Sequence, residues 1–257
     1  MSYMKYEAGG KVYYVPAIDI TDSYNDAYND AYNDAYESAH NEGKIDGASE
    51  ENIRFWNVVQ ANNNRANYGY AFMGWDCDEI KPLYKISPST GSMAMNFAYN
   101  PSLKIVRAEH FDFSQVPAGT SDTLGCYGTF MACGALETIE DIGMPAPYSY
   151  NFTFANCYAL KTIAKMRVNS STKFNKAFNG CSALETLIVE GTIGQNGFGL
   201  PNACSLSATS LESIVNALED KSGTSGTTWT ITLGTTNVAK LTDAQKQTIT
   251  SKGWTYS

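Results

Sequence analysis

The residues of this sequence whose types could support catalysis are two histidines and one acidic turn. His40 and His110 are far apart, and neither falls in a nucleophile or metal-binding motif. Serine-hydrolase, zinc-protease and phosphate-loop motifs are absent from the sequence. The carboxylates at 76–79 could act with a distant carboxylate as in a glycosidase, but such clusters are usually solvated loop tips. We therefore predict no enzyme, with no catalytic residue, no bound metal and no cofactor.

Six cysteines form the other reactive set, and three of them recur at a fixed interval. Cys133, Cys157 and Cys181 are 24 residues apart. Metal binding and disulfides are the alternatives to simple packing, but the sequence offers these cysteines neither a C-x-x-C pair nor a histidine partner. A free thiol behaves as a small buried apolar group. We predict that these cysteines form a packed structural ladder.

A repeated sequence surrounds these cysteines. The segments 130–139, 154–163 and 178–187 share the frame F-x-x-C-x-A-L-x-T-[IL], and 97–105 is a degraded copy. Each copy carries three apolar anchors, which a single turn of chain cannot bury. Copies stacked at the ~4.8 Å spacing of strands would form a continuous core.

This frame resembles the BspA-like subclass of leucine-rich repeats. That subclass occurs in surface and adhesion proteins of host-associated bacteria and in tail-region proteins of phages and prophages of gut bacteria. The resemblance covers 97–218, and 204–257 is similar to the closing module of such phage-associated proteins. It implies an α/β fold: a short leucine-rich-repeat solenoid of about four repeats of ~24 residues, with an N-terminal helix and a C-terminal α/β cap.

The same pattern divides the chain into four predicted segments. They are an attachment and oligomerisation segment at 1–52, a pre-repeat N-terminal cap at 53–96, the repeats at 97–205 and the C-terminal cap at 206–257. In two copies a charged residue, Asp141 or Lys165, takes the place of an apolar strand residue, which predicts a β-bulge.

The C-terminal residues predict a small set of elements. Apolar residues at helical spacing predict a helix over 209–218, and 230–233 has the composition of a strand. Thr242, with Gln245 three residues later, predicts the start of a second helix. The residues 254–256 are expected to return as a final strand.

A tetrad repeat, Tyr-Asn-Asp-Ala, occupies 24–36. Residues four apart on a helix lie about 40° apart around its axis, so tyrosines and alanines would share one side. Asn and Asp are weak helix formers and neighbouring aspartates repel, so this side needs a cover. A period above 3.6 favours right-handed supercoiling, and we predict a homo-oligomer such as a trimer; packing on the chain's own body, or fraying, is the alternative. The predicted oligomerisation residues are Tyr24, Tyr28, Tyr32 and Tyr36.

The charge distribution excludes two kinds of partner. The net charge is −8, and 19–51 alone carries ten acids against one base. No basic patch is available for nucleic acid, and no run approaches the ~20 apolar residues of a membrane span. The N-terminal residues also lack the apolar stretch of a signal peptide.

From these features we expect a non-catalytic binding or structural protein. The resemblance favours a phage or prophage virion component, tail- or fibre-associated, that contacts other virion proteins and a host-surface glycan or protein. The expected location is a virion or an extracellular surface. The alternatives are a bacterial surface adhesin and a passive virion decoration. The candidate ligand-binding residues are the outward strand positions Glu137, Thr138, Glu140, Lys161, Thr162, Glu185, Thr186 and Ile188, with Tyr158 as the nearest aromatic for sugar stacking.

Overall fold

The residues described by the computed structural model are 2–8, 11–17, 72–75, 77–81, 85–87, 92–121 and 125–257. They belong to two compact units, Met1–Ser49 and Glu50–Ser257. In the first unit, strand β1 (Ser2–Ala8) pairs antiparallel with β2 (Lys11–Ala17). The two residues between these strands in the sequence are glycines, which two-residue hairpin connections favour. This hairpin is absent from the sequence-based predictions.

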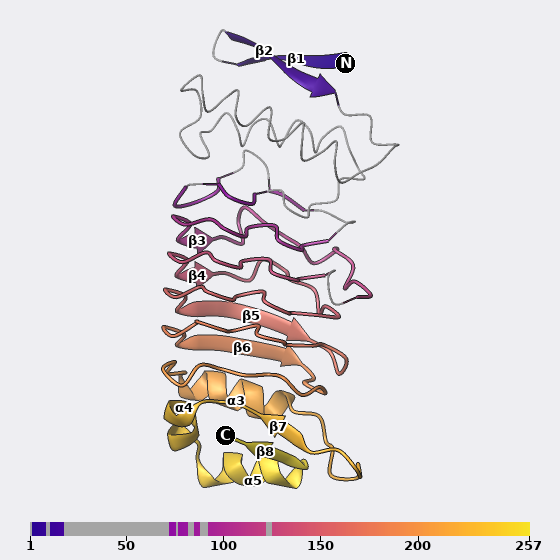
Figure 1. The fold of residues 1–257 in the computed structure, drawn as a ribbon, viewed down its shortest axis with the longest axis vertical. Coiled ribbons are helices and arrows are strands. Elements are labelled where there is room, and N and C mark those ends of the chain that lie inside the picture. The colour runs from indigo at the N-terminus through magenta and orange to yellow at the C-terminus, as the bar shows by residue number, and fades with distance from the viewer. Residues whose placement is uncertain are drawn as a thin grey trace. The chain divides into compact units, whose positions relative to one another are not determined.

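In the second unit, four parallel strands form one sheet in the order of the chain (Figure 1). They are β3 (Ile105–Val106), β4 (Thr138–Ile139), β5 (Thr162–Val168) and β6 (Thr186–Gly191). Thr138 pairs with Thr162, and Thr162 pairs with Thr186. The fixed interval in the sequence therefore sets the register of the sheet.

The predicted leucine-rich-repeat solenoid is wrong for the described residues. The structure has instead a parallel sheet of four strands with few helices, an α/β arrangement. β3 and β4 contain two residues each, against seven in β5 and six in β6. The cause is that the frame repeats while the residues after it do not, so only two copies continue as longer strands. The N-terminal helix of the same prediction falls on residues outside the described ones.

Tight turns make up much of each copy. The residue before the frame cysteine has a left-handed backbone, with φ of 63° at Ala132, 64° at Asn156 and 86° at Gly180. Glycine and asparagine tolerate this conformation best, whereas alanine is strained in it. The backbone conformation at this position is therefore determined by the turn and not by the type of side chain.

The frame phenylalanines form an aromatic column. Ring centroids are 5.1 Å apart between Phe97 and Phe130, 5.9 Å between Phe130 and Phe154, and 5.4 Å between Phe154 and Phe178. The ring planes in these pairs deviate by 8°, 6° and 14°. All four side chains are completely buried. The column is the centre of the apolar core, since each buried ring stabilises the fold by about 1.5–3 kcal/mol.

The bulge predicted from Lys165 is present between β5 and β6, whereas β4 ends at Ile139, before Asp141. The pairing register shifts between Ile163 and Met166. Met166 thereby pairs with Val189, and both side chains are buried. The extra residue accommodates Lys165 in the strand while the apolar side chain of Met166 returns to the core.

Helix α3 (Ala208–Ala217) follows β6 and packs against it (Figure 1). It corresponds to the helix predicted at 209–218. Its buried apolar face includes Leu211, Ile214 and Val215 from the predicted pattern together with Ala217, and the fourth residue of that pattern, Leu218, is the buried C-cap.

Two serines of α3 also bond to the backbone of β6. The Oγ atom of Ser210 accepts a hydrogen bond from the N–H of Leu187 at 3.0 Å. The Oγ atom of Ser213 accepts one from the N–H of Val189 at 3.2 Å. Serine hydroxyls thus take the place of a fifth strand at this edge of the sheet.

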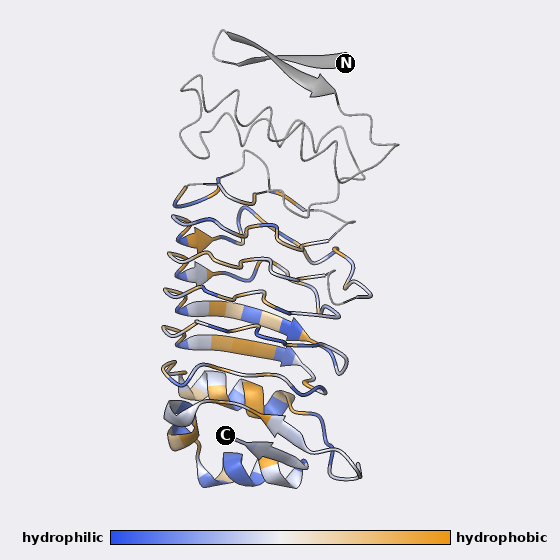
Figure 2. Ribbon diagram, viewed as in Figure 1, coloured by the Kyte–Doolittle hydropathy of each residue, from blue (hydrophilic) through white to orange (hydrophobic). Residues whose placement is uncertain are grey.

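The remaining C-terminal elements form a small parallel pair with two helices. They are β7 (Trp229–Ile231), α4 (Thr235–Lys240), α5 (Asp243–Ser251) and β8 (Trp254–Tyr256). The side chains of Thr242 and Gln245 form the predicted capping box of α5. Helix α5 is largely hydrophilic and β6 largely hydrophobic (Figure 2). Among the described residues, no helix has the length and apolar character needed to span a membrane.

The second unit, Glu50–Ser257, contains the three segments predicted at 53–96, 97–205 and 206–257. The boundaries between those segments stay predictions.

Candidate functional site

The predicted outward row lies along the four-stranded sheet. Thr138, Thr162 and Thr186 form one column of paired residues, each half-buried. The apolar residue after each threonine is buried, as strand alternation requires. Glu140 and Ile188, two positions further along, are also half-buried. The threonines therefore offer a regular line of hydroxyl groups.

The charged members of the row belong to a column of alternating sign. Its order across the layers is Asp78, Lys104, Glu137, Lys161 and Glu185, and each backbone N–H bonds to the carbonyl of the residue before it in that order. Lys161 Nζ lies 2.7 Å from Glu137 Oε2, and Lys104 Nζ lies 3.9 Å from Asp78 Oδ2. The hydrogen bond from Lys161 lowers the pKa of Glu137. Four of the five charges thus lie in ion pairs between neighbouring layers.

Glu140, the remaining charged member of the row, is also paired. Its carboxylate accepts hydrogen bonds from Arg107 Nη1 at 3.3 Å and from the N–H of Ala108 at 2.9 Å. In the outward row the carboxylates of Glu137 and Glu140 are thus bonded within the protein, while the threonines supply neutral hydroxyls.

The two residues that break the apolar strand pattern are partners in an ion-pair group. Asp141 receives hydrogen bonds from both terminal nitrogens of Arg167, at 2.8 and 3.0 Å. Lys165 Nζ lies 3.4 Å from Asp141 and also 3.4 Å from Glu190. The bidentate contact with Arg167 lowers the pKa of Asp141 to about 2. The group links β5 to the segments on either side of it.

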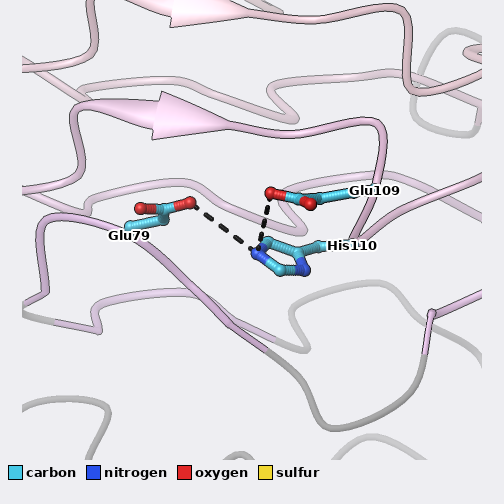
Figure 3. Close-up of side chains that lie close together, drawn as sticks. All are labelled: Glu79, Glu109 and His110. Carbon is cyan, nitrogen blue, oxygen red and sulfur yellow. Dashed lines mark ion pairs between the residues drawn. The ribbon is translucent and has the colours of Figure 1, made fainter.

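Glu79, Glu109 and His110 are the described residues that come closest to a metal-binding group (Figure 3). One ligand atom from each lies within 4.8 Å of the others. However, Arg107 Nε donates to Glu79 Oε1 at 2.5 Å and lies 3.8 Å from Glu109, and Lys81 Nζ lies 3.2 Å from Glu79. Burial would raise the pKa of Glu79, but the hydrogen bonds from Arg107 and Lys81 outweigh it and lower that pKa. A cation would have to displace two basic groups, so the geometry favours an ion-pair network.

The frame cysteines are buried hydrogen-bond donors. The thiols of Cys157 and Cys181 donate to the carbonyl oxygens of Phe130 and Phe154, at 3.0 and 3.1 Å. Burial raises the pKa of Cys181 to about 12, so its thiol keeps its proton at neutral pH. In the degraded copy, Asn100 holds the cysteine position. Its amide donates to two carbonyl oxygens, those of Phe72 and Phe97, at 2.6 and 2.9 Å. A side-chain donor therefore occupies this position in the degraded copy as well, which agrees with the predicted structural role.

Tyr158 has the most exposed of the large hydrophobic side chains in the described part of the chain, at 58%. Its hydroxyl donates to Asn156 Oδ1 at 3.2 Å. A β-carbon built on Gly180 would lie 3.1 Å from the ring, and one built on Gly134 would lie 3.9 Å from it. The glycines leave room for the ring, and its hydroxyl is held, so one aromatic surface is presented in a fixed orientation.

A polar hollow of about 610 Å³ was not foreseen from the sequence. Its lining is rich in amide side chains and contains two lysines and one tryptophan. The lining residues are Asn151, Lys173, Phe174, Asn175, Lys176, Gln195, Asn196, Gly197, Thr227 and Trp229. The one available signal was the recurrence of asparagine three residues before the frame phenylalanine, at Asn151 and Asn175.

The predicted oligomerisation residues are Tyr24, Tyr28, Tyr32 and Tyr36, and they lie outside the described residues. Their role stays a prediction.

No family model, curated protein or solved structure matches the chain. Its function is therefore argued from its own residues.

Proposed function

We propose that the chain is a non-catalytic binding component of a phage or prophage particle, tail- or fibre-associated, that recognises a glycan on the host surface. The resemblance of the 24-residue frame to BspA-like repeats supports the assignment to a phage or prophage particle. The observation that carries the binding role is the exposed, oriented ring of Tyr158.

An exposed aromatic ring suits sugar recognition. The apolar face of a pyranose stacks on such a ring, and little ordering is lost when the ring is already held in place. The hydrogen bond to Asn156 and the glycines at 134 and 180 supply that restraint. We propose a neutral sugar as the ligand, because an aromatic ring and an amide provide stacking and hydrogen bonds and no ionic contact.

A variant series tests this site. Tyr158→Ala should weaken binding of the full chain to immobilised host cell-wall glycans about tenfold, whereas Tyr158→Phe should retain binding because it keeps the ring. Tyr256→Ala, in β8, is the matched control for loss of a tyrosine elsewhere. If Tyr158→Ala binds like the unaltered chain, or if the full chain adsorbs to no host glycan, the proposal is wrong.

The self-association proposed for the particle is tested separately. Replacing Tyr24, Tyr28, Tyr32 and Tyr36 by serine should convert a closed oligomer into a monomer in light scattering. A chain that begins at Asn52 should also be monomeric. Monomers for the unaltered chain at micromolar concentration would contradict this part of the proposal.

A passive decoration is the second candidate function. The ion pairs of Lys104 with Asp78 and of Lys161 with Glu137 favour it, because they engage these charges within the protein. Under that hypothesis, we expect particles that contain the full chain with Tyr158→Ala to adsorb to the host as well as unaltered particles do.

A further inference from the structure

We infer that Tyr99 is a second stacking platform of the glycan site at Tyr158, and that this site binds along a linear, neutral, β-1,4-linked glycan. The inference rests on the function proposed for Tyr158. In the described part of the chain, these two tyrosines are the exposed large hydrophobic residues, with exposed fractions of 48% and 58%. Tyr99 directly precedes the cysteine position of its copy, and Tyr158 directly follows that of its own copy.

Backbone hydrogen bonds place the two tyrosines two layers apart on the same edge of the stack. The N–H of Tyr99 donates to the carbonyl of Met131 at 2.8 Å, and the N–H of Ala132 donates to that of Ala155 at 2.8 Å. The copy at 130–139 therefore lies between the two copies that carry the tyrosines. At the spacing of neighbouring strands, two layers correspond to about 10 Å along the stack.

The layer between the two tyrosines has small residues at both of their positions. Ala132 holds the position of Tyr99, and it is half-buried. Gly134 holds the position of Tyr158. A β-carbon built on Gly134 would meet within 4 Å, apart from its chain neighbours, only Cδ2 of Tyr158 at 3.9 Å. A ligand that crosses from one ring to the other therefore has room above this layer.

Tyr99 has a backbone conformation that its side chain disfavours. Its φ is 58°, in the left-handed region that asparagine and glycine tolerate best. The equivalent residues of later copies are Asn156 and Gly180. An exposed tyrosine thus gives this turn no conformational advantage. Backbone strain of this kind clusters at positions that contact ligands, which supports a binding role for the ring.

The edge that carries the two rings has no charged residue at either turn position. Over four copies these positions hold aromatic, small or uncharged polar residues. They are Tyr99, Ala132, Asn156 and Gly180, and Pro101, Gly134, Tyr158 and Ser182. The nearby column that includes Lys104 and Glu137 is charged in every layer. A ligand on the uncharged edge therefore receives stacking and hydrogen bonds, which suits a neutral glycan.

The distance between the layers favours one type of linkage. In a β-1,4-linked chain each sugar is turned over relative to the one before it, so every second unit presents the same face. The repeat of two units is close to the two-layer distance of about 10 Å, so one extended chain can stack on both rings. An α-1,4-linked chain coils and presents its faces in different directions. Joining two weak contacts in one ligand strengthens binding, because the second contact becomes intramolecular.

The dependence of affinity on chain length tests this inference. The full chain is titrated by calorimetry with cellobiose and cellopentaose, with the dimer and pentamer of β-1,4-linked N-acetylglucosamine, and with maltose and maltopentaose. The first two series separate a plain glucan from an N-acetylated chain. In one or both of them, the pentamer should bind at least tenfold more tightly than the dimer. Equal affinities of dimer and pentamer in both series, no binding of either pentamer, or an equal gain for maltopentaose overturns the inference.

Variants then locate the second contact. Tyr99→Asn removes the ring and keeps the turn, because asparagine holds the equivalent position at Asn156. It should reduce the affinity for the pentamer to that for the dimer and should not lower the melting temperature, whereas Tyr99→Phe should retain the gain. Tyr256→Ala is the matched control and should bind like the unaltered chain; an equal loss there would contradict the site. If Tyr99→Asn retains the gain while Tyr158→Ala loses binding, the inference is wrong and the proposed function stands. If Tyr158→Ala changes nothing, both are wrong.

Discussion

The interior and the outer edge of the repeat region obey the same register but opposite rules of composition. Inside, identical residues follow one another: phenylalanine stacks on phenylalanine at 5.1 to 5.9 Å. At the edge, the sign of the charge changes at every layer from Asp78 to Glu185. The contrast shows that, at equivalent positions of in-register strands, identical apolar residues pack well on one another, whereas charged residues are favoured when their signs are opposite.

This contrast explains why the sequence repeat is incomplete. Inward positions can repeat without penalty, since dispersion and burial reward equal rings and equal thiols. Outward positions cannot repeat a charge without placing like charges opposite each other. Stacking in register therefore explains both patterns. Phenylalanine is repeated at the inward position, and lysine alternates with glutamate at Lys104, Glu137, Lys161 and Glu185.

The largest effect is expected from the centre of the aromatic column. Phe154→Ala removes a completely buried ring that stacks on both neighbours, and it should lower the free energy of unfolding by about 3–5 kcal/mol. Guanidinium denaturation followed by circular dichroism measures this. Tyr158→Ala, an exposed aromatic, should change stability by less than about 0.5 kcal/mol. Equal losses would mean that the column does not dominate the core.

The thiol ladder should give a smaller loss. Cys157→Ala removes one of two donors to the carbonyl oxygen of Phe130, which keeps the N–H of Cys133 at 3.2 Å, so the loss should be about 1 kcal/mol. The same denaturation experiment applies. Cys77, which is only half-buried, provides the comparison, and Cys77→Ala should have a smaller effect. A neutral Cys157→Ala variant would contradict a stabilising role of this hydrogen bond.

The Asp141–Arg167 pair predicts an acid-sensitive component of stability. The folded-state pKa of Asp141 is about 2, below the value of about 3.9 for an unfolded chain. Its contribution is therefore complete above about pH 4 and is lost as pH falls towards about 2. Asp141→Asn should be less stable than the unaltered chain at pH 7, and the difference should shrink at pH 2. A constant difference across this range would exclude the pair as its source.

The smallest effect is expected at the charged edge. Lys161→Glu places three acids in successive layers and should lower the melting temperature at low ionic strength. The loss should diminish in high salt, because these groups are exposed and screened. Adding Glu137→Lys should recover part of it. A salt-independent loss would indicate damage to packing and not charge repulsion.

The sequence predicts the inward half of the repeat region well and the outer half poorly. The frame predicts which residues stack and which pair, as Thr138, Thr162 and Thr186 do, because register follows from the fixed interval. It does not predict that β3 and β4 stop after two residues, because the residues after the frame differ between copies. Local rules also succeed where they are strong, as in the capping box of Thr242 and Gln245.

The candidate sites depend on contacts that no single-sequence pattern reveals. The hollow joins residues around 151, 175, 196 and 229, which only the stacking of layers brings together. The pairing of Glu137 with Lys161 likewise follows from their layers lying side by side. Strand alternation predicts which side of the sheet Thr138, Thr162 and Thr186 face, but it does not predict the ion pairs of the charged residues that precede them.

The serine contacts of α3 also determine how an array of this kind can grow. The N–H groups of Leu187 and Val189 are bonded to Ser210 and Ser213, so they offer no template on which the strand of another molecule could add. Parallel in-register strands are otherwise prone to open-ended polymerisation. We therefore expect an added 24-residue unit to fit ahead of β6, where in-register pairing continues, and not between β6 and α3.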